Sequence, residues 1–185
     1  LSVDVLLAKH YLNAQSAGGY GAVAAMGRAI FWGATGVATV LFPKISFRGA
    51  LGRSGASLVC ASLGLVAVGG VVGLAVLTVA ARPLVTAFAG PAYAAAASYL
   101  PWYAVGMTLL GAAAVLIAAH QSAGKPAFLA VLVPITLLEP MLIALFHGSA
   151  TQVVQVLDVS MALLAIGLGG VFLAQRRPTW TPPLA

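Results

Sequence analysis

The stretch GASLVCASLGLVAVGGVVGLAVLTVAA, residues 55–81, decides the fold class of this chain. It contains no charged residue, and it is longer than the roughly 20 apolar residues with which a helix crosses the hydrocarbon core of a bilayer. In the whole chain, 62% of the residues are hydrophobic and 6% are charged, whereas an ordinary soluble domain has about 25% charged residues. So few charges could not cover a surface in water, but an apolar exterior is stable in lipid. The sequence therefore predicts an all-α integral membrane protein.

Outside this stretch, apolar runs alternate with short connections rich in Gly and Pro, which usually mark helix boundaries. The pattern predicts a polytopic transmembrane bundle over residues 1–177, with about six helices of which the first is incomplete. We expect the helices at residues 1–12, 18–42, 55–81, 92–119, 126–146 and 153–174, followed by a cytoplasmic tail at 178–185. The chain opens on Leu1 within an apolar run, so we expect a fragment whose N-terminal part is missing.

The basic residues predict how the bundle is oriented in the membrane. If every predicted helix spans, one side carries Lys44, Arg48, Arg53, Lys125, Arg176 and Arg177. The loops of the opposite side carry only Arg82. Because cytoplasmic loops are enriched in Lys and Arg, we expect the C-terminus in the cytoplasm and the bundle in a bacterial inner membrane. The net charge of +6 then reflects topology, and no nucleic acid is expected as a partner.

All three acidic residues fall inside predicted helices, and two basic residues do as well. An ionisable group at the bilayer centre costs about 2.5–3.5 kcal/mol even on the mildest scale, so such groups usually face the interior of a bundle. At about 1.5 Å per residue, Asp4 and Arg28 lie at similar depths on neighbouring antiparallel helices, which predicts that an ion pair can form. Two interpretations remain open. Either the pair joins two helices while Lys9 reaches the headgroups, or Arg28 and Lys9 attract an anionic substrate into a cavity.

The other two acidic residues are candidates for ion coupling. Glu139 precedes Pro140, which removes a backbone donor and kinks the helix, and a buried carboxylate beside a kink is a plausible proton or cation site. Asp158 is three residues from Gln155, so the two are expected to share a helix face. The simpler alternative, which we favour, is a polar seam between the last two helices.

Small and aromatic residues predict how the helices contact each other and the interface. Gly69 and Gly73 form a GxxxG motif, which lets two helix backbones approach closely in lipid. Tyr99, Trp102 and Tyr103 lie near one end of a predicted helix, where aromatic rings favour the headgroup region. We therefore expect these three to anchor the bundle at the interface.

No constellation typical of a soluble enzyme occurs, so we expect no enzymatic activity and no cofactor. Cys60 is the single cysteine and is expected to be a small buried core residue. His10, His120 and His147 lie near predicted helix ends, and the last two are at opposite faces of the membrane, so no metal site is expected.

Four short segments resemble a known family. They are DVLLAKHYL at 4–12, AGGY at 17–20, VLFPKIS at 40–46, and PLV with FAGPAY within 83–93. They are similar to segments of the polysaccharide-transport (oligosaccharide flippase) proteins of the multidrug/oligosaccharidyl-lipid/polysaccharide exporter superfamily. The resemblance covers about half of the chain by motif. Gly19 departs by one residue from the tighter family form, and Ala89 stands where a bulkier residue is common.

The resemblance implies the second half of a twelve-helix transporter. Such a protein would flip a lipid-linked oligosaccharide, a precursor of cell-envelope polysaccharide, to the outer leaflet by alternating access. Its sugar would travel in a central cavity completed by the missing N-terminal half of the same chain, with membrane lipids around it. Arg28 and Lys9 would hold the pyrophosphate, and Asp4 would orient them.

Two other functions stay open. An ion-coupled exporter of drugs or small molecules would use Asp4, Glu139 or Asp158 as a proton or sodium site. A membrane scaffold without transport activity would recruit enzymes of envelope synthesis, and its function would survive neutralisation of all the intramembrane charges.

Overall fold

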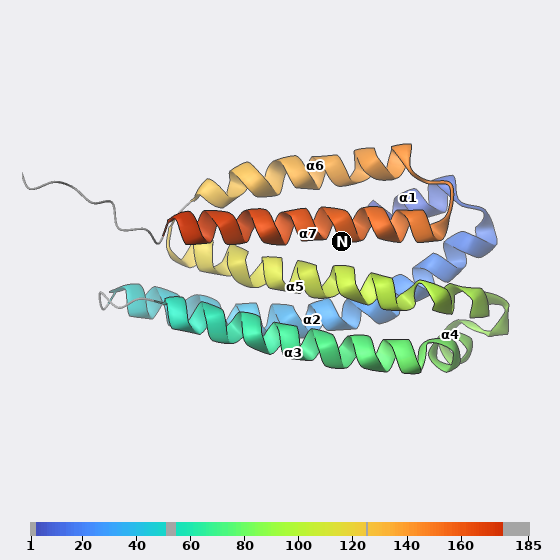
Figure 1. Cartoon of the computed structure of the whole chain (residues 1–185), viewed down its shortest axis with the longest axis horizontal. Helices are drawn as coiled ribbons and strands as arrows, with labels where there is room; N and C mark the ends of the chain where they lie inside the picture. Colours follow the sequence, from blue (N-terminus) through green and yellow to red (C-terminus); the bar gives the residue numbers. More distant parts are fainter. Residues whose placement is uncertain (1–2, 51–54, 125, 176–185) are drawn as a thin grey trace, which may run out of the picture.

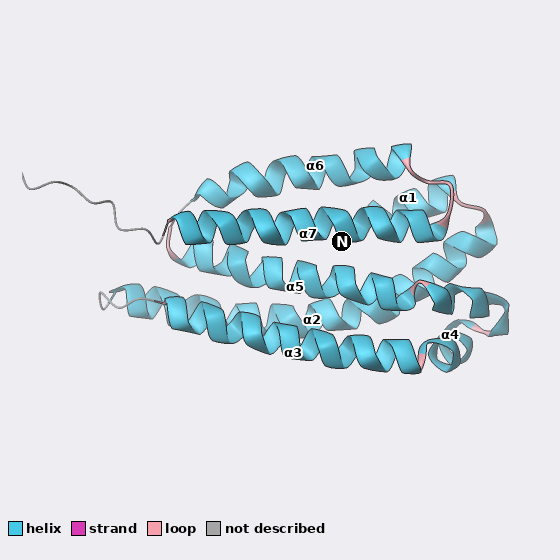
Figure 2. Cartoon of the chain, in the orientation of Figure 1, coloured by secondary structure: helices cyan, strands magenta, loops and turns pink. Residues whose placement is uncertain are grey.

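The computed structural model describes residues 3–50, 55–124 and 126–175. Across these residues the chain forms helices joined by short loops, without a β-strand (Figures 1 and 2). The elements are α1 (Val3–Tyr11), α2 (Ala14–Ala50), α3 (Ala56–Val79), α4 (Ala81–Ala89), the 3-10 helix η1 (Pro91–Ser98), α5 (Leu100–Ser122), the 3-10 helix η2 (Pro126–Phe128), α6 (Leu129–Leu145) and α7 (Ala150–Ala174). The predicted all-α bundle is therefore confirmed.

Five helices are long and apolar enough to cross a membrane, as expected of a membrane protein. They are α2, α3, α5, α7 and the stretch Pro126–Leu145, which comprises η2 and α6. Large apolar side chains such as Leu65, Val71 and Ile166 are more than half exposed on the outside of the bundle, where lipid would cover them. The remaining helices, α1 and α4, have nine residues each, and α1 covers only part of the length of the bundle (Figure 1).

Several boundaries differ from the sequence-based expectation. Residues 14–17, expected in a turn, begin α2, because the Asn13 side chain accepts a hydrogen bond from the Ser16 N–H (2.8 Å) and caps the helix. The same helix continues through Pro43 to Ala50 instead of ending at 42. Proline removes one donor, but a helix in a membrane tolerates it where its surroundings satisfy the freed carbonyl.

The helix expected at 92–119 is two elements. Residues 91–98 form η1, and α5 starts at Leu100 and ends at Ser122. Pro101 explains the break, since proline lacks an N–H and fits the first turn of a helix but not its interior. Before η1, residues 81–89 form the short helix α4. It is followed by Gly90 with a positive φ of 98°, a conformation that glycine adopts without strain.

Helix α5 lies at the centre of the bundle, and it packs against α2 and α3 on one side and α7 on the other (Figure 1). Helix α6 covers α7 and contacts α1. Glycines permit close approach here, since a Cβ at Gly111 would collide with Ala34 of α2 and a Cβ at Gly70 would collide with Thr108 of α5. In the predicted GxxxG motif, Gly73 does face Ile30 of α2, but no atom lies within 4 Å of a Cβ at Gly69. The close helix contact therefore involves Gly70 and Gly73 instead of the predicted pair.

Basic residues lie toward both ends of the described bundle. Lys44 and Arg48 lie at the end of α2, and Arg82 lies in α4 at the opposite end (Figure 1). The other four residues of the predicted basic side, Arg53, Lys125, Arg176 and Arg177, lie outside the described residues, as does the predicted tail at 178–185. The orientation of the bundle in the membrane therefore remains a prediction.

Candidate functional site

Asp4 is the centre of a buried polar network that joins three helices. Its side chain in α1 is 4% exposed. The Arg28 Nη2 of α2 donates to Asp4 Oδ1 at 2.8 Å, and the two groups form an ion pair. The hydroxyls of Tyr20 in α2 and Tyr103 in α5 donate to Asp4 Oδ2 at 3.1 and 2.9 Å. The predicted pairing of Asp4 with Arg28 is confirmed, and the carboxylate has three donors instead of one.

The local sequence explains why these groups meet. Only Leu12 and Asn13 connect α1 to α2, so the two helices run back along each other and bring Asp4 to the depth of Tyr20 and Arg28. The Tyr103 ring can approach α2 because residue 27 is glycine, and a Cβ at Gly27 would collide with that ring. The rings of Tyr20 and Tyr103 then meet edge to face, with centroids 5.9 Å apart and planes at 87°.

The network satisfies the Asp4 carboxylate but leaves Arg28 with an open donor. Charge-assisted hydrogen bonds of this kind are about twice as strong as neutral ones and offset much of the cost of burying a charge. The Arg28 side chain is 19% exposed, and within the described part of the chain its buried Nε–H has no hydrogen-bond partner. Arg28 can therefore accept a further negatively charged or polar group.

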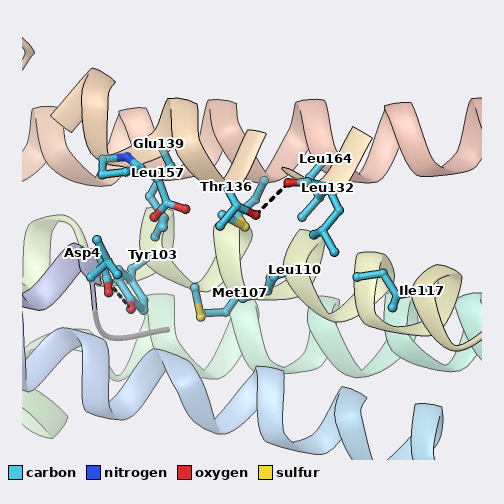
Figure 3. Close-up of a pocket in the computed structure, with 13 residues that line it drawn as sticks. Asp4, Tyr103, Met107, Leu110, Ile117, Leu132, Thr136, Glu139, Leu157 and Leu164 are labelled. Carbon is cyan, nitrogen blue, oxygen red and sulfur yellow. Dashed lines mark hydrogen bonds between the residues drawn. The ribbon is translucent and has the colours of Figure 1, made fainter. Parts of the chain in front are cut away.

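A cavity of about 200 Å³ lies next to Asp4, between α1, α5, α6 and α7 (Figure 3). Its polar groups come from Asp4, Tyr103, Thr136 and Glu139, and the rest of its wall is apolar. Neither Arg28 nor Lys9 is among the residues that line it. Since a water molecule occupies about 30 Å³ in the liquid, the cavity has room for a few waters or a small ion, but not for an oligosaccharide.

Glu139 is the second carboxylate on this cavity. It extends from α6 toward the side of the cavity where Asp4 and Tyr103 lie (Figure 3). It is partly buried and forms neither a hydrogen bond nor an ion pair with any described residue. The next residue, Pro140, has no N–H to donate to the Thr136 carbonyl in the preceding turn. This part of α6 therefore presents acceptor oxygens without the usual donors.

Asp158 does not join this cavity. Its carboxylate lies over Gly106 of α5, where a Cβ would collide with Oδ1. That oxygen is buried and has no hydrogen-bond partner among the residues that the structure describes. Gln155 is exposed and lines a shallow groove with Leu142 of α6. The polar seam expected between α6 and α7 is therefore wrong for Asp158, because the 60° between residues three apart on a helix is enough to turn it toward α5.

The structure also places Lys9 and the three aromatic residues that were expected at the interface. Lys9 is exposed on α1. The expectation that Cys60 is buried is wrong, because its position on α3 is exposed. Trp102 is 58% exposed, but Tyr99 and Tyr103, which were also expected at the interface, are buried with 7% and 0% exposure.

Sequence reasoning missed Tyr20 and Tyr103 as ligands of Asp4. The sequence does contain tyrosines that could reach a carboxylate inside the membrane. Only the packing of α5 against α2 shows that Tyr20 and Tyr103 are the ones that do.

No cluster of three or more His, Cys, Asp or Glu side chains that could hold a metal ion occurs among residues 3–50, 55–124 and 126–175. Chemically, the arrangement combines an ion pair, a carboxylate without a hydrogen-bond partner among the described residues, and a small cavity inside apolar helices. None of the protein-family models, curated proteins or solved structures compared with this chain matches it.

Proposed function

We propose that this chain forms part of a membrane transporter that flips a lipid-linked oligosaccharide across the cytoplasmic membrane. The observation that carries the proposal is the buried ion pair of Arg28 and Asp4, whose carboxylate lines a cavity between membrane-length helices. Ionisable groups inside a membrane are costly, and they usually mark the path of a substrate or an ion. The resemblance of residues 4–12, 17–20 and 40–46 to polysaccharide-transport proteins supports the same function.

In this proposal the pyrophosphate of the lipid carrier competes with Asp4 for Arg28. The planar guanidinium binds phosphate oxygens through several donors at once, and its Nε–H is the donor that Asp4 leaves open. Lys9 adds a second positive charge on α1, and Asp4 orients Arg28 between transport cycles. A cavity of about 200 Å³ cannot enclose the sugar, so the proposal requires a second wall, as the family resemblance implies, and a rocking of the two walls against each other.

The test replaces Arg28 in the protein as the cell produces it. Arg28→Ala should abolish export of the polysaccharide, because Asp4 cannot bind a phosphate. The lipid-linked intermediate should then accumulate on the cytoplasmic leaflet, where extraction and mass spectrometry can measure it. The amount of protein in the membrane is measured in parallel by immunoblotting.

Arg48→Ala is the matched control. It removes the same side chain from the same helix, but Arg48 lies at the end of the bundle, where it donates to Ser57 Oγ (3.3 Å). Export should stay at the wild-type level in this variant. Normal export by an Arg28→Ala protein present at normal abundance would exclude Arg28 from the transport path and would remove the main support for the flippase.

The second candidate is an ion-coupled exporter. The observation that favours it is the lining of the cavity, which includes the carboxylates of Asp4 and Glu139 and, among the described residues, no Lys or Arg. A cavity with this composition favours a proton or a small cation over an anion. Glu139 would bind and release the ion, while Asp4 stays in its network.

Glu139→Gln distinguishes the two candidates. In vesicles that contain the wild-type protein, an ion-coupled exporter should transport its substrate only when a proton or sodium gradient is imposed. The variant should lose this dependence on the gradient. Transport of lipid-linked oligosaccharide that needs no gradient and is unchanged by Glu139→Gln would exclude this candidate.

A further inference from the structure

A groove runs between α2 and α3, the two helices that lie side by side along one edge of the bundle (Figure 1). Two adjoining hollows form it, with volumes of about 530 and 400 Å³, and they share Gly33, Val37 and Leu65 in their walls. Among the described residues, all of its lining is glycine or apolar except Lys44 and Ser62. The groove is therefore an apolar channel with a cation at one end.

The groove exists because α2 and α3 touch near both of their ends and separate between them. A Cβ at Gly55, just before α3, would come within 2.9 Å of Ile45, and a Cβ at Gly73 would come within 2.8 Å of Ile30. Between these two contacts no atom lies within 4 Å of a Cβ at Gly36. Small residues thus leave space that neither helix fills, and in a membrane a lipid chain would fill it.

The groove has the length of one bilayer leaflet. Gly33 and Lys44 lie about 16 Å apart along α2, at about 1.5 Å per residue. One leaflet contributes half of a hydrocarbon core that is about 30 Å thick. With Lys44 at the level of the headgroups, Gly33 lies near the middle of the bilayer. The apolar part of the groove therefore matches the reach of a single acyl chain.

Lys44 provides the charge that a headgroup would recognise. Its side chain is exposed and has no hydrogen-bond or ion-pair partner among the described residues. None of the three acidic residues of the chain lines the groove. A Lys at the surface of a membrane attracts anionic lipids. The open end of the groove is thus complementary to a negatively charged phosphate.

We propose that this groove binds one acyl chain of an anionic glycerophospholipid whose phosphate pairs with Lys44. The acyl chain lies along the apolar wall and occupies the space beside Gly33 and Gly36. The single positive charge selects a headgroup with a net negative charge over a zwitterionic headgroup on the same chains. This binding goes beyond the transport function, and it depends only on the helices lying in a membrane.

The test measures lipid binding to the whole protein in detergent by native mass spectrometry. The two probes are phosphatidylglycerol and phosphatidylcholine with identical oleoyl chains, added at increasing concentration. The wild type should bind the first phosphatidylglycerol molecule about fivefold more tightly, the factor expected for one Lys beside an anionic headgroup. Equal affinity for the two lipids would overturn the proposal.

Lys44→Gln should abolish the preference for phosphatidylglycerol. Arg82→Gln is the matched control, because it removes one positive charge from an exposed position on α4 that does not line the groove. The control should keep the fivefold preference, since a general attraction by the charge of the protein would fall equally in both variants. Equal loss of preference in the two variants would show that Lys44 has no special role, and would contradict the proposed site.

A second pair of variants tests the position of the acyl chain. Gly36→Leu fills the groove and should weaken the binding of both lipids about threefold, which corresponds to a few lost carbon–carbon contacts. Gly64→Leu adds the same side chain to α3 at a position that does not line the groove, and it should leave binding unchanged. Both glycines have no atom within 4 Å of an added Cβ, so both variants should fold. Equal binding by the two variants would place the lipid elsewhere.

The same spectra identify two other occupants. A complex of two chains that Gly36→Leu separates would assign the groove to a second copy of the protein. Tighter binding of a polyprenyl phosphate than of phosphatidylglycerol would assign it to the carrier lipid of the proposed transport reaction. Either result would overturn the phospholipid site. Lipid binding at equilibrium needs no transport, so a failed export assay with Arg28→Ala would leave this measurement unaffected.

Discussion

Asp4 and Asp158 contact residues of α5 that lie within one helical turn of each other, yet the surroundings of the two carboxylates are opposite. Asp4 packs against Tyr103 and accepts three hydrogen bonds, including one from a guanidinium. Asp158 packs against Gly106, and its buried Oδ1 has no donor among the described residues. The three donors offset much of the cost of burying the Asp4 carboxylate, whereas no described donor offsets that cost at Asp158 Oδ1. Two acidic residues inside the same bundle can therefore have very different surroundings. The side chains packed against each carboxylate decide whether it has hydrogen-bond donors.

The largest effect is expected when the Asp4 network loses its cation. Arg28→Met keeps most of the side-chain volume but leaves the Asp4 carboxylate buried without a counter-charge. Removal of one partner of a buried ion pair typically destabilises a protein by about 3–5 kcal/mol. The free energy of unfolding, measured by denaturant titration in mixed micelles, should fall by about this amount. The double variant Asp4→Asn with Arg28→Met should lose less than the two single variants lose in sum, and a loss equal to that sum would show that the pair is not coupled.

The second prediction concerns the contact between Asp158 and Gly106. Gly106→Ala should destabilise the bundle by about 1–3 kcal/mol, because the added Cβ would collide with Asp158 Oδ1 and force the helices to shift. Gly33→Ala is the control, since no atom lies within 4 Å of a Cβ at Gly33. The control should be neutral or slightly stabilising, as alanine favours helix over glycine. Equal effects of the two substitutions on thermal unfolding in detergent would contradict the close contact between α5 and α7.

The smallest effect tests the comparison most directly. Asp158→Asn should change the free energy of unfolding by less than about 0.5 kcal/mol, because no hydrogen bond to Oδ1 is lost. The identical change at Asp4 should cost about 1.5–3 kcal/mol, since it removes the charge that Arg28 and two tyrosines stabilise. Both variants can be measured side by side by the same denaturant titration. If Asp158→Asn is as costly as Asp4→Asn, the Asp158 carboxylate has a strong partner in the folded protein and the contrast between the two acids fails.

The candidate site was predictable in its charged members and unpredictable in its neutral ones. Depth along two adjacent helices predicted the pairing of Asp4 with Arg28, because the connection between them is short. Tyr103 is 99 residues from Asp4 in sequence, and no local pattern relates the two. Its ring reaches the carboxylate because α5 packs on α2 at Gly27, a contact that depends on how side chains interlock and not on periodicity.

The amino-acid sequence by itself determined that the chain is helical and suited to a membrane, because long runs without charge can satisfy their backbone groups in lipid only as helices. It also determined which residues are costly inside the bundle. Only the tertiary structure decided which of these residues have partners, that Glu139 shares a cavity with Asp4, and that Asp158 faces α5. Apolar helices can pack against one another in many ways of similar energy. The arrangement is therefore selected by close contacts at a few glycines and by buried polar groups, and these contacts exist only between elements that are distant in sequence.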